Sequence, residues 1–289
     1  MSAIHGNEIN PVHARRRFDR AAKLFAGADF VHRHTGEGLL QRLLPISIRP
    51  DRILDLGSAL GAGSRQLAKQ FKKARIISLD GSAHMLCDAS RRKGWFSKIH
   101  EVQADAGQLP LRAGCMDLVF ANMLLPLIDD LPGCLAEVAR VLRKDGAFLF
   151  STLGPDSLAE LRAAWSHIDD GCHVRRFPDM HDLGDAVLRA GLRDPVLDVD
   201  ALDISYRSPA ALFADLTATG ARNSLRDRRR SLVGKGPISL LSKHLCGEQT
   251  GGLLRLRLEL VYGHAWGGGP SFGPAEFRLA PEDITRRHK

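Results

Sequence analysis

Apolar positions recur along this chain with two different periods, and their alternation predicts its elements. Residues 12–45 repeat apolar side chains at helical spacing, which predicts a helical arm that ends near Pro45. From there to residue 151, short continuous apolar runs alternate with amphipathic stretches, as in sheets of buried parallel strands. The predicted strands are 52–56, 75–80, 99–104, 116–121 and 147–151, and the predicted helices between them are 64–71, 82–92 and 131–142.

Beyond residue 151 the rhythm changes. The predicted helices there are 157–168, 180–190 and 209–220, and the predicted strands are 195–206 and 253–262. The last strand alternates leucine with charged residues, which favours one buried and one exposed face. Residues 222–252 are basic and rich in glycine, and we interpret them as a surface excursion. The Gly/Pro-rich tail after Trp266 is predicted to be mobile.

These elements predict an α/β fold, a doubly wound, Rossmann-like sheet with an N-terminal helical arm and helical insertions in the C-terminal half. We expect four parts along the chain. They are the arm at 1–48, a cofactor-binding core at 49–155, the remaining sheet with substrate-covering insertions at 156–266, and the tail at 267–289.

Composition narrows the possible functions. The 289 residues are 44% hydrophobic, enough for a full core, and no run of 18 apolar residues predicts a transmembrane helix. The polar N-terminus lacks an apolar signal region, so we expect a cytoplasmic protein. Its five cysteines lie far apart without C-x-x-C spacing, which favours reduced thiols over disulfides or a zinc site.

The chain is basic, with a net charge of +8 from 41 Lys and Arg against 33 Asp and Glu. Such charge favours an acidic partner, although solvated surface charge explains the same pattern. Aromatic residues are only 6% and are not interleaved with the basic runs, so a stacking platform for single strands is not indicated. The basic runs are 15–17, 91–93, 226–230 and 286–289.

A glycine-rich turn after the first predicted strand carries the strongest functional signal. Residues 53–63 place Gly57 and Gly61 between an apolar strand and a helix, where backbone N–H groups can approach a ligand. Asp80 ends the second strand, and an acid there can accept both ribose hydroxyls of a nucleoside cofactor. The spacing matches neither G-x-G-x-x-G nor a P-loop. The sequence therefore predicts a nucleotide-type site at the carboxyl edge of a parallel sheet.

Four motifs in order resemble class I S-adenosylmethionine-dependent methyltransferases. Asp55-Leu-Gly57 resembles the D-x-G-x-G-x-G motif, with Ala59 in place of its middle glycine. Asp80 resembles the ribose-binding acid, residues 104–106 the adenine loop, and 109–120 the stretch that enters the fourth strand. The resemblance implies S-adenosyl-L-methionine as cofactor. It implies a cofactor site formed by Asp55, Gly57, Gly61, Asp80, Gly81, Asp105, Ala106 and Asn122.

A second resemblance covers nearly the whole chain. Residues 17–22, 150–158, 173–177, 182–184, 220–223 and 261–266 are similar to the malonyl-[acyl-carrier protein] O-methyltransferase family of biotin synthesis. Members of that family carry Gln or His followed by Trp after the fourth strand, where this chain has Pro126 and Leu127.

This resemblance implies methylation of the free carboxylate of a malonyl thioester on acyl carrier protein. Such a carboxylate is already ionised at neutral pH, so no general base is expected. An arginine fork suits a carboxylate, and His173 with Arg176 are the catalytic candidates. The candidate substrate-binding residues are Tyr206, Arg222 and Asn223. The basic runs would steer the acidic carrier protein, and neither nucleic acid nor membrane is an expected partner.

Three alternatives stay open from the sequence. The chain also resembles the protein-arginine hydroxylases that assemble respiratory complex I, and other methyltransferases of this fold. It does not carry the N-P-P-Y motif of base amino methylases after the fourth strand. A non-catalytic S-adenosylmethionine-binding protein is the third alternative, with Ala59 as a mark of a decayed site. His167-x-Asp169 resembles part of an iron triad, but i and i+2 diverge on a helix, and no metal is expected.

Overall fold

The computed structural model describes residues 8–94, 97–228, 234–246 and 253–268. The tail at 269–289, and with it the basic run 286–289, lies outside the described residues, as do Arg229 and Arg230 of the run 226–230. None of the described helices combines the length and apolar character needed to cross a membrane.

A seven-stranded mixed sheet forms the centre of the protein. Its order is β3 (Ile99–Gln103), β2 (Arg75–Asp80), β1 (Arg52–Leu56), β4 (Met116–Asn122), β5 (Leu142–Leu153), β7 (Leu254–Gly267) and β6 (Leu192–Tyr206). The first five are parallel, whereas β7 is antiparallel to both of its neighbours. Chain order reverses between β1 and β4, so the loops after these strands diverge at the carboxyl edge of the sheet. Ligands bind at such a reversal point in open α/β sheets.

Nine α-helices and a short 3-10 helix, Leu125–Leu127, are described around this sheet. The α-helices are α1 (Pro11–Phe25), α2 (Phe30–Leu43), α3 (Ala62–Gln70), α4 (Ala83–Arg92), α5 (Leu131–Val141), α6 (Ala159–Ser166), α7 (Met180–Arg189), α8 (Pro209–Ala218) and α9 (Lys235–Cys246). Polar side chains begin several of them by accepting a backbone N–H of the first turn, as Asn10, Ser82 and Ser208 do.

Two apolar clusters fix the helices on opposite faces of the sheet. On one face Leu135 of α5 and Val187 of α7 are fully buried. On the other face Leu39 of α2 and Leu67 of α3 are fully buried. Burying one such side chain stabilises the fold by about 1.5–3 kcal/mol, so each short helix is held by packing more than by its own propensity.

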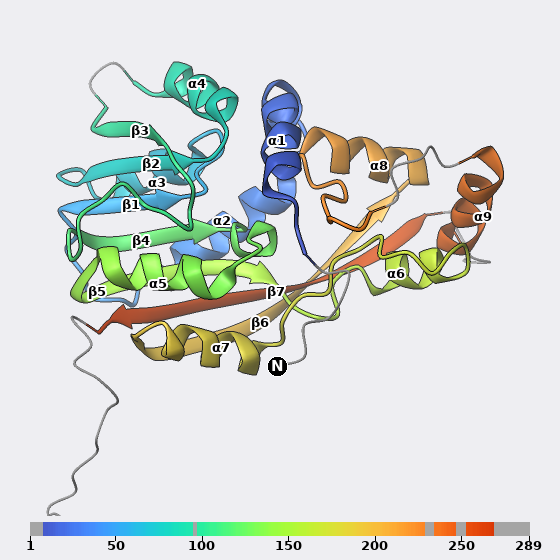
Figure 1. The fold of residues 1–289 in the computed structure, drawn as a ribbon. Helices are drawn as coiled ribbons and strands as arrows, with labels where there is room; N and C mark the ends of the chain where they lie inside the picture. Colours follow the sequence, from blue (N-terminus) through green and yellow to red (C-terminus); the bar gives the residue numbers. More distant parts are fainter. Residues whose placement is uncertain (1–7, 95–96, 229–233, 247–252, 269–289) are drawn as a thin grey trace, which may run out of the picture.

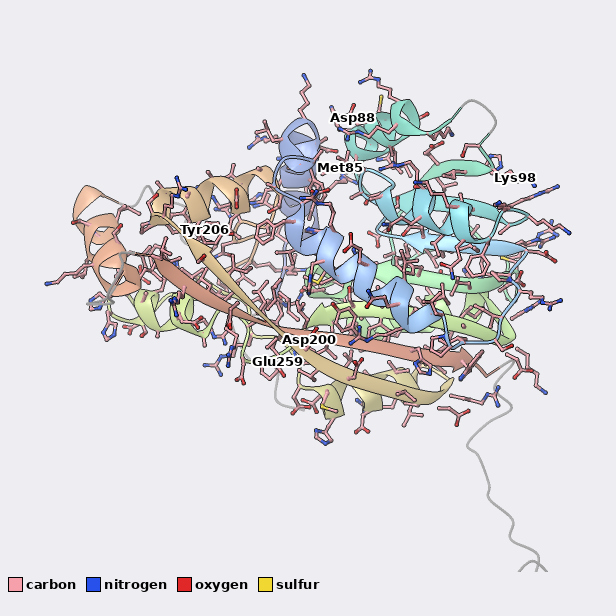
Figure 2. The ribbon with its side chains drawn as sticks, turned by 180° about the vertical axis from the view of Figure 1, so that it is seen from behind. Met85, Asp88, Lys98, Asp200, Tyr206 and Glu259 are labelled. Carbon is pink, nitrogen blue, oxygen red and sulfur yellow. The ribbon has the colours of Figure 1, made fainter. Side chains whose placement is uncertain are left out.

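The strands β6 and β7 run past the parallel part of the sheet, and three helices gather at their far end (Figure 1). We call α6, α8 and α9 the cap; they share an apolar cluster with Leu254 and Leu256 of β7. Figure 2 shows Tyr206 at the cap end of β6, with Glu259 further along the strand pair. In Figure 1, α1 stands between α4 and α8, and it contacts both. The cap therefore faces the carboxyl edge of the sheet across α1.

The predicted fold class is confirmed. All seven predicted strands are present, although β5, β6 and β7 are longer than predicted. The arm breaks into α1 and α2 around residues 26–29. The interpretation of 222–252 as a surface excursion is wrong for α9, whose Leu241 is fully buried against the cap.

Candidate active site

The turn after β1 holds its backbone in conformations that suit glycine. The φ angle is +76° at Gly57, +46° at Ala59 and +70° at Gly61, which begins α3. A left-handed backbone costs an L-residue about 1–2 kcal/mol, so neighbouring contacts must hold Ala59 there. The N–H groups of Gly57 and Ser58 donate to the carbonyl of Leu79 in β2, at 2.8 and 3.1 Å. The turn is thus fixed against β2 by the protein itself.

Asp55 supports this turn from within β1. Its buried carboxylate accepts a hydrogen bond from Ser64 Oγ at 2.5 Å. A Cβ on Gly63 would lie only 3.2 Å from Asp55 Oδ2, so glycine lets α3 begin this close to the acid. Burial raises the pKa of Asp55 to about 6, against the opposing effect of the Ser64 hydrogen bond. Asp55 lies beneath the turn, where it orients the start of α3.

Asp80 ties together the loops after β1 and β2. Its Oδ2 accepts the N–H of Ala59 at 2.9 Å, and its Oδ1 accepts the N–H of Ser82 at 2.8 Å. Burial raises the pKa of Asp80, whereas these two backbone hydrogen bonds lower it. Each carboxylate oxygen keeps a second lone pair, so the group can still accept two hydroxyl donors. At the next residue, Gly81, a Cβ would meet no atom closer than the Ala104 carbonyl oxygen at 3.9 Å. This pair of acceptor oxygens fits a ribose diol.

The loop after β3 lies beside that of β2. The N–H of Ala104 donates to the carbonyl of Asp80 at 3.2 Å. Asp105 is exposed and its Oδ1 accepts the N–H of Gly107 at 2.8 Å, which shapes a tight turn around Ala106. The structure therefore brings the predicted ribose acid and the predicted adenine loop to one edge of the sheet.

Asn122 ends β4, and its amide is bound by protein groups on both sides. Its Nδ2 donates to the carbonyl of His32 in α2 at 2.8 Å, and its Oδ1 accepts the hydroxyl of Ser151 at 2.7 Å. The backbone then turns sharply at Met123, where φ is +55°. Asn122 thus anchors α2 to the sheet edge, and its cofactor-binding role stays a prediction.

Helix α1 packs against the cofactor edge, a contact that the sequence did not reveal. Asp19 accepts the hydroxyl of Ser82 at 2.6 Å and lies 3.2 Å from His84 Nδ1. Ser82 is also a partner of Asp80. Phe18 of the same helix packs in an apolar cluster with Ala59. Helix α1 therefore contacts both the turn after β1 and the loop after β2.

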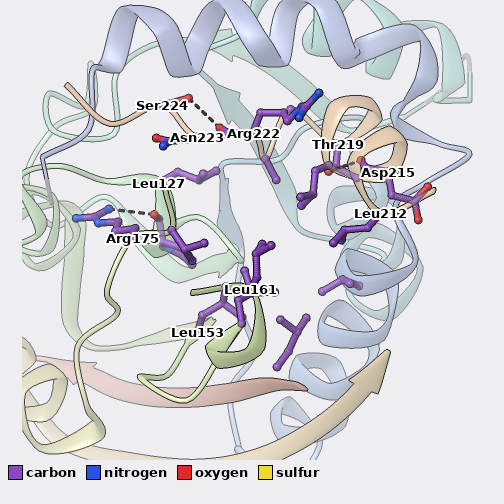
Figure 3. A pocket seen from close by; sticks show the side chains of 18 of the residues that line it. Leu127, Leu153, Leu161, Arg175, Leu212, Asp215, Thr219, Arg222, Asn223 and Ser224 are labelled. Carbon is purple, nitrogen blue, oxygen red and sulfur yellow. Dashed lines mark hydrogen bonds between the residues drawn. The ribbon is translucent and has the colours of Figure 1, made fainter. Parts of the chain in front are cut away.

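A cavity of about 290 Å³ lies between the carboxyl edge of the sheet and the cap (Figure 3). The loop after β4 lines it with Met123, Pro126 and Leu127. Figure 3 shows apolar side chains such as Leu153 and Leu212 on other walls. A mostly apolar cavity with a few polar groups is typical of a binding site for an organic ligand. Pro126 and Leu127, where members of the resembling family carry other residues, therefore shape the cavity wall.

Of the two neighbouring arginines after α6, Arg175 lines the cavity and Arg176 does not. Arg176 is exposed. The Nη1 of Arg175 donates to the carbonyls of Pro126 and Ile128, at 2.9 and 2.7 Å. Burial lowers the pKa of Arg175, against the effect of nearby Asp129. The sequence analysis proposes Arg176 as the residue that binds the substrate carboxylate. In the structure Arg175, not Arg176, contacts the cavity wall and fixes it.

His173 also lines the cavity, in a fixed orientation. Its ring stacks on Trp165 with centroids 3.7 Å apart, and its Nε2 lies 2.6 Å from Asp169 Oδ1. His167 instead stacks on His244 of α9 at 4.3 Å. His167 and Asp169 therefore meet different partners. The described residues contain no group of three or more His, Cys, Asp or Glu side chains that could hold a metal ion.

Tyr206, Arg222 and Asn223 all line the cavity, as a substrate-binding role requires. Burial and then Asp215, which is hydrogen-bonded to the phenol, raise the pKa of Tyr206 to about 12. The amide Nδ2 of Asn223 donates to the Cys172 carbonyl at 3.0 Å, so this side chain mainly shapes the turn. Arg222 donates through Nε to the Thr217 hydroxyl at 3.0 Å, and its guanidinium lies over the Phe213 ring, 5.2 Å from the centroid. Its Nη groups have no hydrogen-bond partner among the described residues.

His32 is a cavity residue that the sequence analysis missed. Its Nδ1 is buried without a hydrogen-bond partner in the described part of the chain. Burial lowers the pKa of His32 to about 4, so the ring is neutral at pH 7 and keeps one N–H donor. One signal was present, since His32 stands seven residues after Phe25 and seven before Leu39 on the apolar stripe of the arm.

Comparisons with known proteins agree with this geometry. A protein family described as "Methyltransferase domain" matches residues 54–150, from β1 to β5. The malonyl-[acyl-carrier protein] O-methyltransferase of Gallionella capsiferriformans is 38% identical over 258 residues, 87% of this chain and 89% of that protein. The relative of the same name from Halorhodospira halophila is 37% identical over 281 residues, 95% of each chain. The chain belongs to the malonyl-[acyl-carrier protein] O-methyltransferase family.

A solved structure supports the fold independently. The YcgJ protein from Bacillus subtilis superimposes with a TM-score of 0.58 at 15% identity, covering 80% of this chain and 97% of that one. The class I methyltransferase fold is thereby confirmed, and the matching methyltransferase family and relatives confirm S-adenosyl-L-methionine as the cofactor. The residues present fit that cofactor, because Asp80 retains two acceptor positions beside the glycine turn.

Proposed function

We propose that this member of the family methylates the free carboxylate of a malonyl thioester on acyl carrier protein, giving the methyl ester used in biotin synthesis. One observation carries the proposal: the 290 Å³ cavity begins at the loop after β4, beside the edge where the glycine turn and Asp80 form the cofactor site. A substrate in the cavity can therefore meet a cofactor held at that edge.

The reaction requires the protein to position the carboxylate rather than to remove a proton from it. S-adenosyl-L-methionine supplies an electrophilic methyl group on a sulfonium. A carboxylate with a pKa of about 4 is ionised at neutral pH and needs no base. Holding it in line can contribute up to about 7–11 kcal/mol, and the apolar lining excludes water that would solvate the nucleophile.

His32 is the donor that best fits the orienting role. Its own carbonyl is held by Asn122 at the end of β4, which fixes the ring near the cofactor edge. A neutral N–H binds a carboxylate oxygen less tightly than a guanidinium does, so the carboxylate stays nucleophilic. Arg175 donates two hydrogen bonds from Nη1 to backbone carbonyls and thereby positions the loop after β4.

The test of the reaction is methyl transfer from labelled S-adenosyl-L-methionine to malonyl-acyl carrier protein, with acetyl-acyl carrier protein as control. We expect label in the malonyl form alone, in a base-labile ester. Cofactor binding without label in either form would remove the proposed reaction and favour a non-catalytic cofactor-binding protein.

The test of His32 uses His32→Phe, which keeps the ring volume and removes the hydrogen bond. We expect kcat/KM to fall about tenfold, the effect of one lost hydrogen bond to a charged group, with an unchanged Kd for S-adenosylhomocysteine. His32→Gln should restore part of the loss. The matched control is His34→Phe, an exposed position on the same helix. An unchanged kcat/KM in His32→Phe would exclude this role.

The partner in this proposal is an acidic carrier protein, attracted by the basic surface of the enzyme. The proposal needs neither nucleic acid nor a membrane. The four cysteines that the structure describes in full are free, which fits the reducing cytoplasm in which we place the enzyme.

A further inference from the structure

Four arginines gather where α1 meets the turn that follows α8. We call Arg17, Arg20, Arg222 and Arg228 the arginine cluster. Arg17 is partly buried, and burial, then repulsion by Arg228, Arg222 and Arg20, lowers its pKa. Arg222 also lines the cavity, as do Phe18 of α1 and the turn residues 219–225. Through Arg222 the cluster therefore reaches the cavity wall, and its other three arginines lie beside that wall.

Specific contacts hold the two segments of the cluster together. The N–H of Asn10 donates to the carbonyl of Ser224 at 2.8 Å. Arg228 Nη2 lies 3.0 Å from His13 Nδ1, on the same helix as Arg17. On the other side Phe18 packs so closely on Gly220 that a Cβ there would lie 3.1 Å from its ring. The cluster is thus built into the fold from segments about two hundred residues apart in sequence.

The positive charge of the cluster is not neutralised within the described residues. There, no ion pair joins Arg17, Arg20 or Arg222 to a carboxylate, whereas Arg226 in the same turn pairs with both Glu8 and Asp129. Asp227, next to Arg228, is exposed, and two other acids near the cluster in sequence have partners elsewhere. Asp19 accepts from Ser82 and lies beside His84, and Asp215 is hydrogen-bonded to Tyr206. Neighbouring guanidiniums without acids repel one another, so an anion bound between them would be stabilised.

We propose that the arginine cluster binds the phosphate of the phosphopantetheine arm on which the acyl thioester is carried. This inference rests on the proposed function and extends it: the malonyl carboxylate binds near the cofactor edge, and the phosphate at the other end of the arm binds the arginine cluster. Arginine forks match the geometry of phosphate oxygens, and a partly buried arginine binds them more strongly than an exposed one does. The position at the cavity wall favours a group on the entering arm over carboxylates on the surface of the carrier.

The length of α1 separates the two ends of such a substrate. Phe25 of α1 lies 4.9 Å from the ring of His32, centroid to centroid, beside the cofactor edge. Arg17 stands eight residues earlier on the helix, or about 12 Å along its axis. The cavity between them is mostly apolar, as the thin, uncharged part of a pantetheine arm requires.

The experiment compares two small thioesters that differ only in the phosphate, malonyl-pantetheine and malonyl-4′-phosphopantetheine. For the wild-type enzyme we expect kcat/KM to be at least about tenfold higher for the phosphorylated form at low salt, with the ratio falling as salt rises. Arg17→Gln and Arg20→Gln should lower this ratio severalfold while kcat/KM for malonyl-pantetheine stays unchanged. Arg15→Gln, two residues away on another side of α1, should keep the wild-type ratio.

Three outcomes overturn the inference. They are equal kcat/KM for both thioesters in the wild type, an equal loss for both thioesters in the variants, and a variant effect that appears only with the intact carrier protein. The last would assign the cluster to the carrier surface. Calorimetric binding of 4′-phosphopantetheine against pantetheine gives the same comparison without turnover. If neither small thioester is methylated, methyl transfer to malonyl-acyl carrier protein still decides the proposed function, while the calorimetric preference and its loss in Arg17→Gln decide the phosphate site.

Discussion

The cofactor edge and the cap cavity lie side by side, yet they are built in opposite ways. At the cofactor edge, residues close in sequence bind one another through the backbone, and both oxygens of Asp80 already accept protein N–H groups. The cavity is assembled from segments between Ile9 and Leu258, and His32 and Arg222 keep polar atoms without partners among the described residues. The first region is complete before its ligand arrives. The second has polar groups that a ligand must satisfy, so specificity resides there.

The largest effect is expected from removing the acid that completes the cofactor edge. Asp80→Ala deletes the acceptor of two backbone N–H groups and the proposed acceptor of the ribose hydroxyls, at about 2 kcal/mol for each such hydrogen bond. We expect the Kd of S-adenosylhomocysteine, measured by calorimetry, to rise about a thousandfold. Asp88→Ala is the control, since Asp88 pairs with Arg91 on the exposed side of α4. A tenfold change or less for Asp80→Ala would contradict a completed cofactor edge.

The pH dependence of stability should separate the two regions next. In the folded protein the pKa of Asp55 is raised to about 6, so stability falls as pH rises from about 4 to 6. The pKa of His32 is lowered to about 4, so stability rises over nearly the same range. These contributions oppose each other in the wild type. Between about pH 4.5 and 6, Asp55→Asn should gain, and His32→Gln lose, about 2 kcal/mol of unfolding free energy relative to the wild type.

Urea unfolding at the two pH values checks this prediction. The controls are His34→Gln, at an exposed position of α2, and Asp88→Asn, in the surface ion pair with Arg91. Parallel pH profiles for wild type, Asp55→Asn and His32→Gln would show that burial does not shift these two groups.

The same contrast explains how much the sequence could predict. The order of the strands and the ligand edge follow from local patterns, because Asp55, the glycine turn and Asp80 lie within a single strand–helix–strand unit. Family membership was likewise visible in short motifs along the chain, and the relatives confirm it. A site formed by residues this close in sequence can be recognised from local motifs.

The cavity could not be predicted in the same way. His32 meets the end of β4 only because Asn122, ninety residues later, binds its carbonyl. Motif spacing does not distinguish the adjacent Arg175 and Arg176, and only the tertiary structure shows that Arg175 lines the cavity. Helix α9 was missed because its packing partner, the far end of β7, lies beyond it in the chain. Such contacts depend on tertiary placement rather than on periodicity.

Filling the cavity should affect the substrate without affecting the cofactor. Leu216 of α8 lines the cavity and is only partly buried, so Leu216→Trp can extend into the space with little strain in the core. We expect kcat/KM for the malonyl carrier to fall about tenfold with an unchanged Kd for S-adenosylhomocysteine. Leu216→Met conserves the volume and should retain activity within about twofold. A matching loss of cofactor affinity in Leu216→Trp would mean that the two regions are not separable.

The smallest effect concerns Ala59, the residue that departs from glycine in the cofactor turn. Its φ of +46° is unfavourable for an L-residue by about 1–2 kcal/mol, while glycine loses about 0.4–1 kcal/mol more chain entropy on folding. Ala59→Gly should therefore raise the free energy of unfolding by about 0.5 kcal/mol. Ala62→Gly, three residues later at the exposed start of α3, should lower it by about 0.5–1 kcal/mol. The two Ala→Gly changes should therefore shift the free energy of unfolding, measured in urea, in opposite directions. If both changes raised it or both lowered it, Ala59 would not be held under strain by the turn.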